Sequence, residues 1–71
     1  MTLYGTSYFV SERDAALYYR DYCETAKDAR ALVATKIADG EIHIGPPGPL
    51  NPGERLTTVD GGRRYAVVVE E

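Results

Sequence analysis

The sequence predicts an α+β fold in which two helices pack on one face of a small antiparallel sheet, in the order β-α-α-β-β-β. Three observations predict this fold. Two successive segments each begin with a helix-capping sequence, residues near both ends of the chain are rich in β-branched and aromatic types, and a double glycine separates the last two extended segments. With 71 residues, the chain is expected to form a single domain over 1–71.

The first and last extended segments are predicted to lie side by side in the sheet. Residues 3–10 are rich in tyrosine, threonine, phenylalanine and valine, which is typical of a strand, and their apolar side chains fall on both faces. Residues 65–69 are apolar throughout, as in a strand that is buried on both faces. We therefore expect residues 65–69 to form the central strand and to neighbour the first strand.

The first helix is predicted to begin at Glu12. Ser11 precedes Asp14 by three residues, which resembles a capping box with aspartate in place of the usual glutamate or glutamine. A helical wheel gathers a set of mostly apolar side chains on one side, which we interpret as the core face. That set is Ala15, Ala16, Tyr19, Tyr22 and Cys23.

A second helix is predicted to follow a tight bend. Thr25 stands three residues before Asp28, so the helix should begin at the next residue, and Gly40 suits the left-handed C-cap that would end it. Its apolar stripe comprises Ala26, Ala29, Leu32, Val33 and Ile37. A single long helix over 12–39 is the alternative, but the two apolar stripes do not stay in register.

The rest of the chain is predicted to complete the sheet. Residues 41–44 alternate as in a short strand, while the four prolines within 45–53 exclude a helix or a central strand and predict a stiff loop. The double glycine between residues 56–59 and 64–69 predicts a hairpin, because glycine permits the positive φ of primed turns. With the two glycines at the centre of the turn, position 56 faces position 67.

Charge and cysteine content narrow the class of protein. The net charge of −3 argues against non-specific binding to nucleic acid or to anionic lipid, both of which need a basic surface. A single cysteine cannot form an internal disulfide, so we expect a reducing cytoplasm. We find neither a signal-peptide pattern nor an apolar run long enough to span a membrane.

The chain holds few side chains capable of covalent chemistry. His43 is its single histidine, and it is expected to point to solvent from a short strand. Cys23 is expected to be a buried apolar side chain, as free cysteines often are. A lone histidine without matching ligands makes a poor metal site. We therefore expect no enzyme, no metal and no cofactor. A small enzyme that uses Cys23 or His43 is the weakest of the alternatives.

Carboxylates on the first helix give the candidate binding surface. Aspartates seven residues apart lie two turns apart on one face, about 10 Å by helix rise. Spaced carboxylates can stand in for phosphates at a basic groove, and a tyrosine beside them would add a rigid contact ring. The predicted partner-binding residues are Asp14, Tyr18, Asp21, Glu24 and Asp28. A solvated helix face without a partner is the alternative reading.

The chain resembles very small uncharacterised proteins carried by bacteriophages and related mobile elements. The similar pattern runs from residues 15–19 through 25–28 to 40–46, and then through 52–56 to 62–65. In size, acidity and lack of an active site the chain also resembles anti-CRISPR proteins, which bacteriophages use to block CRISPR-Cas complexes. That resemblance implies stoichiometric binding to a protein with a basic surface, such as a Cas subunit, and no direct contact with nucleic acid.

A second hypothesis needs no nucleic-acid mimicry. In it the chain is a protein-interaction or self-associating module that uses its sheet edge, its proline loop or the arginines at its hairpin. A homodimer would belong to this hypothesis.

Overall fold

The computed structural model describes residues 2–70 and has an α+β fold, which confirms the predicted class. These described residues form two α-helices, two short 3₁₀ helices and five strands. In chain order they are β1 (Thr2–Tyr4), β2 (Tyr8–Phe9), α1 (Glu12–Tyr19), η1 (Arg20–Tyr22), α2 (Ala26–Ala38), β3 (His43–Ile44), β4 (Glu54–Val59), η2 (Asp60–Gly62) and β5 (Arg64–Val69).

The sheet is built around β5, as predicted. This strand pairs in antiparallel fashion with β4 along one edge, and with β1 and then β2 along the other. Its middle residues Ala66, Val67 and Val68 are buried. The expectation of a wholly antiparallel sheet is wrong, because β2 and β3 pair in parallel, with Phe9 opposite Ile44. The sheet is therefore mixed.

The predicted first strand is divided in two. Gly5 has φ +76° and is followed by a turn that the Tyr8 amide closes by donating to the Gly5 carbonyl at 3.3 Å. A positive φ of this kind is accessible to glycine but interrupts an extended strand. The chain consequently pairs with the end of β5 through β1 and with its beginning through β2.

The C-terminal hairpin has the predicted register. Leu56 lies opposite Val67, and pairing extends from Glu54 opposite Val69 to Val59 opposite Arg64. Three successive residues at the turn have positive φ, and two of them are the predicted glycines; the values are 54° at Asp60, 68° at Gly61 and 88° at Gly62.

Each α-helix begins directly after the N-cap residue that the sequence predicts. The Ser11 hydroxyl accepts from the Asp14 amide, and the Thr25 hydroxyl accepts from the Asp28 amide, each at 3.1 Å. The predicted starts of both helices and the bend between them are confirmed. Beyond α2, Gly40 has φ +77°, as the predicted C-cap requires.

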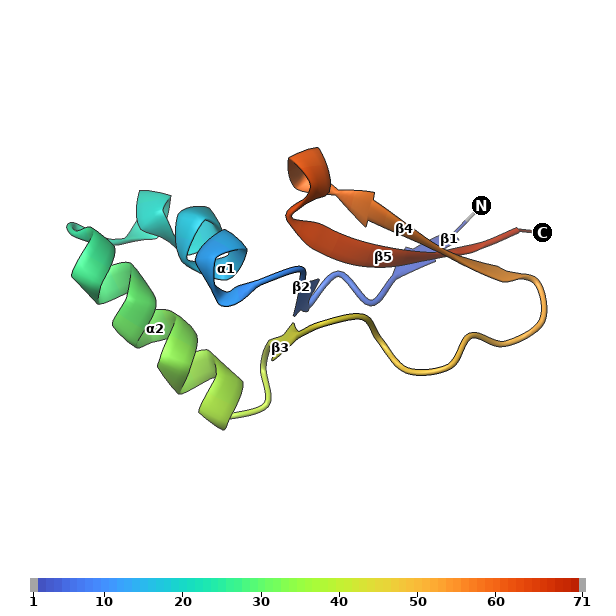
Figure 1. The fold of residues 1–71 in the computed structure, drawn as a ribbon, viewed down its shortest axis with the longest axis horizontal. Helices are drawn as coiled ribbons and strands as arrows, with labels where there is room; N and C mark the ends of the chain where they lie inside the picture. Colours follow the sequence, from blue (N-terminus) through green and yellow to red (C-terminus); the bar gives the residue numbers. More distant parts are fainter. Residues whose placement is uncertain (1, 71) are drawn as a thin grey trace.

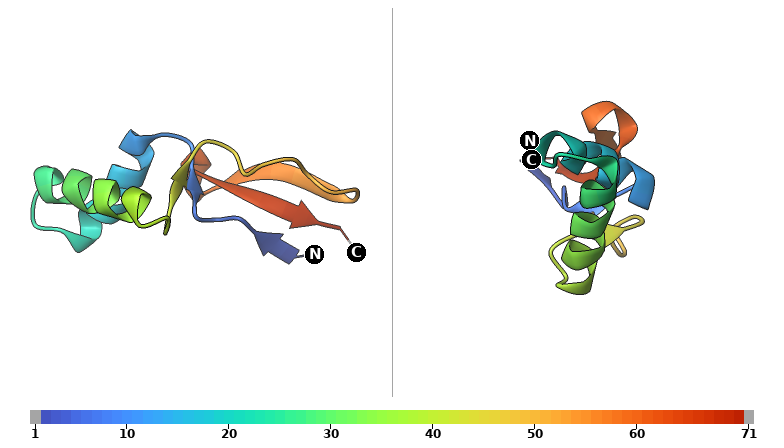
Figure 2. Two further views of the ribbon diagram at one scale, coloured as in Figure 1. Left: turned by 90° about the horizontal axis from the view of Figure 1, so that it is seen from below. Right: turned by 90° about the vertical axis from the view of Figure 1, so that its left-hand side faces the viewer.

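The helices do not cover a face of the sheet, contrary to prediction. Figures 1 and 2 show the α1–α2 pair beyond the turn end of the β4–β5 hairpin, and the molecule measures 41 × 23 × 15 Å. The chain leaves the sheet through the short strand β2, opposite the first residue of β5, and this exit carries the helices past its end. A buried cluster of Phe9, Ala15, Val33 and Ile42 joins the helices to the sheet.

Candidate functional site

The predicted acidic surface is only partly assembled. Asp14 is half-buried at the start of α1, where the Ser11 hydroxyl donates to its carboxylate at 2.8 Å, so it serves the helix cap. Asp21, Glu24 and Asp28 are exposed around the turn between α1 and α2. These three carboxylates form no ion pair with any residue in the described range, 2–70.

Tyr18 packs against the core of the chain, although the helical wheel predicts it beside the carboxylates on the polar side of α1. Its ring packs against the buried ring of Phe9 at a centroid distance of 5.6 Å, and the Arg64 guanidinium lies 4.9 Å from its centre. The helical wheel placed it wrongly because the core partner, β2, approaches α1 from the Tyr18 side. The prediction that Tyr22 is a core residue is also wrong, since this side chain is 72% exposed.

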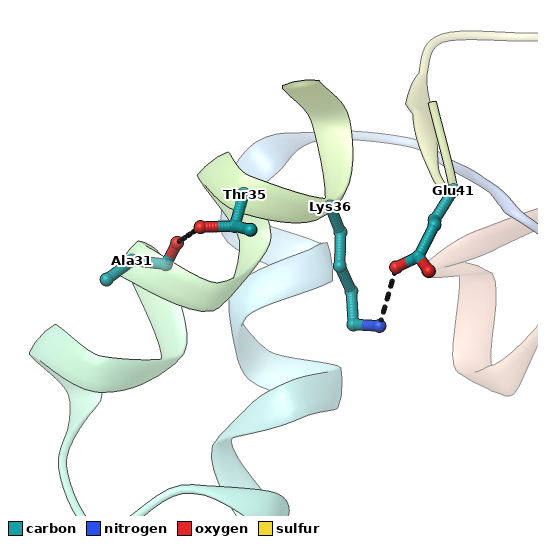
Figure 3. Close-up of polar contacts among 4 residues, drawn as sticks. All are labelled: Ala31, Thr35, Lys36 and Glu41. Atoms are coloured by element: carbon teal, nitrogen blue, oxygen red, sulfur yellow. Dashed lines mark hydrogen bonds and ion pairs between the residues drawn. The ribbon is translucent and has the colours of Figure 1, made fainter. Parts of the chain in front are cut away.

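A small pocket of about 380 Å³ lies where the helices meet the sheet. Lys36 enters it from α2, and its ammonium pairs with Glu41 at 3.0 Å (Figure 3). The same ammonium lies 5.3 Å from the centre of the Tyr19 ring. The hydrogen bond and charge of Glu41 raise the pKa of Lys36. Arg64 enters from β5 and is paired with Asp60 at 2.6 Å. Both cations are thus paired with carboxylates close to them in the sequence, and Arg64 also connects β5 to α1 through its contact with the Tyr18 ring.

The residues with potential for catalysis are separated. Cys23 lies just before α2 and is half-buried, whereas the sequence predicts a fully buried side chain. His43 follows α2. The 13-residue helix between them is about 20 Å long, which excludes a cysteine–histidine pair. His43 is exposed, as predicted, and stacks on Tyr8 with ring centroids 4.6 Å apart. Residues 2–70 contain no group of three or more side chains suited to holding a metal ion.

A larger concave feature is a groove between α1 and α2, with a volume of about 590 Å³. Its floor is apolar and rich in alanine: Ala16, Leu17, Ala26, Ala29, Val33, Ala34 and Ile37. Of these floor residues, Leu17 is 42% exposed, whereas Ala29 and Val33 are buried. We refer to this feature as the α1–α2 groove.

The remaining lining residues of the α1–α2 groove are charged. They are Glu12 and Arg13 from α1, Arg20 from η1, and Arg30 from α2. Three of the eight basic residues in the chain therefore meet there with only one of its eleven acidic residues. The groove has a local formal charge of +2 (three arginines less one glutamate), opposite in sign to the net charge of −3 for the whole chain.

Sequence reasoning missed this groove. The signal was present in Leu17 and Ala34, which lie outside the core stripes assigned to their helices. An isolated leucine on a polar face is common and needs no explanation. Only the packing of α1 against α2 brings these residues into one surface.

Comparison with protein-family models, curated proteins and solved structures found no match. Within residues 2–70, neither helix has the length and apolarity that crossing a membrane requires. Evidence on function therefore comes from the geometry of the chain itself.

Proposed function

We propose that this protein acts by binding a protein partner, without catalysis, and that the partner docks in the α1–α2 groove. The observation that carries this proposal is the groove itself, an apolar concave surface formed by two helices and left open to solvent. Apolar contact patches rimmed by polar residues are typical of protein-interaction sites. We place the interaction in the cytoplasm of a bacterial cell, in keeping with the resemblance to phage-borne proteins.

Two leucines of equal exposure provide a matched test. Leu17 in the groove and Leu50 in the proline loop are each 42% exposed, so an aspartate at either position should leave the fold intact. Pull-down from bacterial lysate would compare the two variants with the unaltered chain. We expect Leu17→Asp to reduce capture of a specific partner by at least about tenfold, because it places a charge in an apolar contact, whereas Leu50→Asp retains capture.

One result of the pull-down would contradict docking in the α1–α2 groove. If Leu17→Asp captures the same proteins as Leu50→Asp, the groove is not the docking surface. Circular dichroism checks that both variants remain helical. Should Leu17→Asp unfold, Ala34→Glu, at another exposed position on the groove floor, takes its place.

A second candidate function is an anti-CRISPR-type inhibitor that binds a Cas protein through its acidic surface. The observation that favours it is a group of exposed carboxylates at the α1–α2 turn that form no ion pair with other residues among 2–70. Asp14 and Tyr18, which the sequence also predicts to belong to that surface, have structural contacts of their own. The acidic surface of this second candidate therefore consists of Asp21, Glu24 and Asp28.

Charge reversal tests the inhibitor candidate. In a plaque assay on a host with active CRISPR interference, Asp21→Lys with Glu24→Lys should abolish protection of the phage. The control, Asp39→Lys with Glu70→Lys, makes the same change in net charge at exposed sites away from the turn. Protection that survives the first pair would rule out the acidic surface, and protection lost equally with both pairs would indicate a non-specific charge effect.

A further inference from the structure

The charge on the α1–α2 groove indicates the chemistry of its occupant. The side chains of Arg13 and Arg30 are exposed and form no hydrogen bond or ion pair with any other residue in the described part of the chain. Arg20 donates from its guanidinium to the Cys23 carbonyl at 2.9 Å, which fixes this side chain at the edge of the groove. Unpaired arginines around an apolar floor favour a partner that presents carboxylates beside apolar side chains.

The shape of the groove indicates the backbone form of its occupant. The helices on both sides satisfy their own backbone groups, so the groove offers no free edge to which an extended strand could add. Four of the seven apolar residues on its floor are alanines, whose small side chains allow a third helix to approach closely. Helices laid into apolar grooves are a common mode of recognition.

Nucleic acid fits this surface less well. Its phosphates could contact the three arginines, but the floor of the groove is apolar and the whole chain is acidic. Affinity for nucleic acid depends on extended neutralisation of phosphates, which a net charge of −3 opposes.

We infer that the α1–α2 groove receives an amphipathic helix of a partner protein, with apolar side chains on the alanine-rich floor and carboxylates against Arg13 and Arg30. This inference rests on the proposed function and specifies its partner. The helix would complete a three-helix arrangement and cover Leu17.

Two synthetic peptides of about 18 residues test the inference, a length sufficient for appreciable helicity. One carries leucine and alanine along one face with flanking glutamates; the second has lysine at each glutamate position. Amide chemical shifts of the intact chain are followed by NMR during titration. We expect the acidic peptide to shift the amides of Leu17, Ala29 and Ala34 and to bind more weakly as salt is raised, while the basic peptide leaves these amides unchanged.

Arginine variants give the matched control. Arg13→Glu with Arg30→Glu should weaken the acidic peptide on the order of tenfold, because two favourable charge contacts become repulsive. Lys27→Glu with Arg63→Glu changes the net charge equally at exposed positions outside the groove and should have an effect of less than about twofold.

Three results would overturn the inference. Equal binding of both peptides at the groove would show that charge does not select the occupant, while leaving the groove as a docking surface. Binding of only the basic peptide, at Asp21, Glu24 and Asp28, would assign recognition to the acidic surface. If neither peptide shifts groove amides, the occupant is not a helix of this kind, and the separate comparison of Leu17→Asp with Leu50→Asp still decides the proposed function.

Discussion

At the scale of single residues, Glu54 connects the end of the proline loop and β4 to β1, which is distant in the sequence. Its carboxylate accepts from the Asn51 amide at 2.6 Å and from the hydroxyl of Tyr4, which lies on β1. The end of the proline loop, β4 and β1 are thereby connected at the end of the molecule opposite the helices (Figure 1). These hydrogen bonds lower the pKa of Glu54, and the hydrogen bond to Glu54 raises the pKa of Tyr4.

The lowered pKa of Glu54 predicts a dependence of stability on pH. Because the folded-state pKa lies below the ordinary value of 4.5, the ionised carboxylate stabilises the fold above about that pH. This contribution is lost as pH falls through the folded-state value. We expect thermal unfolding to show that the stability advantage of the unaltered chain over Glu54→Gln shrinks as pH falls from 6 to 3, a range that spans about 1.5 units on either side of the ordinary pKa.

NMR titration of Glu54 gives a direct check. Tyr4→Phe removes the hydroxyl donor and should move the pKa of Glu54 back toward 4.5, while Tyr22→Phe, at an exposed tyrosine far from β1, should leave it unchanged. A Glu54 carboxyl that titrates at or above its ordinary value in the unaltered chain would contradict the prediction.

At the scale of elements, the two helices are defined largely by their first turns. The hydroxyls of Ser11 and Thr25 each satisfy an amide that has no partner within its helix. Between the helices, η1 and the bend at 23–25 let α2 turn back against α1, and this return forms the groove. The helix caps therefore position the proposed docking surface as well as the helices.

Removal of a cap should destabilise the chain in a predictable way. Ser11→Ala and Thr25→Ala are each expected to lower the free energy of unfolding by about 1 kcal/mol, since each leaves a helix amide unsatisfied. Thr25→Ser, which keeps the hydroxyl, should cost less than about 0.5 kcal/mol. Denaturant unfolding followed by circular dichroism measures these differences. Equal stability of Thr25→Ala and Thr25→Ser would show that the hydrogen bond at this cap contributes little.

Local signals predicted the elements well and their arrangement less well. Capping sequences and the double glycine act over a few residues, so they located both helix starts and the register of Leu56 with Val67. The break at Gly5 and the position of Tyr18 depend on what packs against them, which periodicity alone does not specify. The α1–α2 groove was missed for the same reason, since it exists only once the helices have packed together.

At the scale of the whole molecule, one small cluster connects two dissimilar halves. The helices lie beyond the end of the hairpin (Figures 1 and 2). Contact between the halves is concentrated at β2 and at the position where the Arg64 guanidinium lies over the Tyr18 ring. Phe9 is 1% exposed and packs with Ala15 of α1 and Val33 of α2, while its own strand pairs with β5. An interface this small makes the stability of each half depend on a few side chains.

Phe9 is therefore expected to control whether the chain unfolds as one unit. Phe9→Ala should lower the free energy of unfolding by about 3–5 kcal/mol, the usual cost of removing a buried aromatic ring, which is a large part of the total stability of a small domain. Leu50→Ala, at a leucine that is 42% exposed in the proline loop, should change it by less than about 0.5 kcal/mol.

Hydrogen exchange measured amide by amide distinguishes unfolding as one unit from separate unfolding of the halves. In Phe9→Ala we expect amides of α2 and of β5 to lose protection together. The helices lose the side chain that attaches them to the sheet, and β5 loses its pairing with β2. If β5 stays protected while α2 exchanges freely, the hairpin with β1 is stable by itself. In that case the helical pair, with its groove, would be a separately unfolding unit whose order a bound partner helix would reinforce.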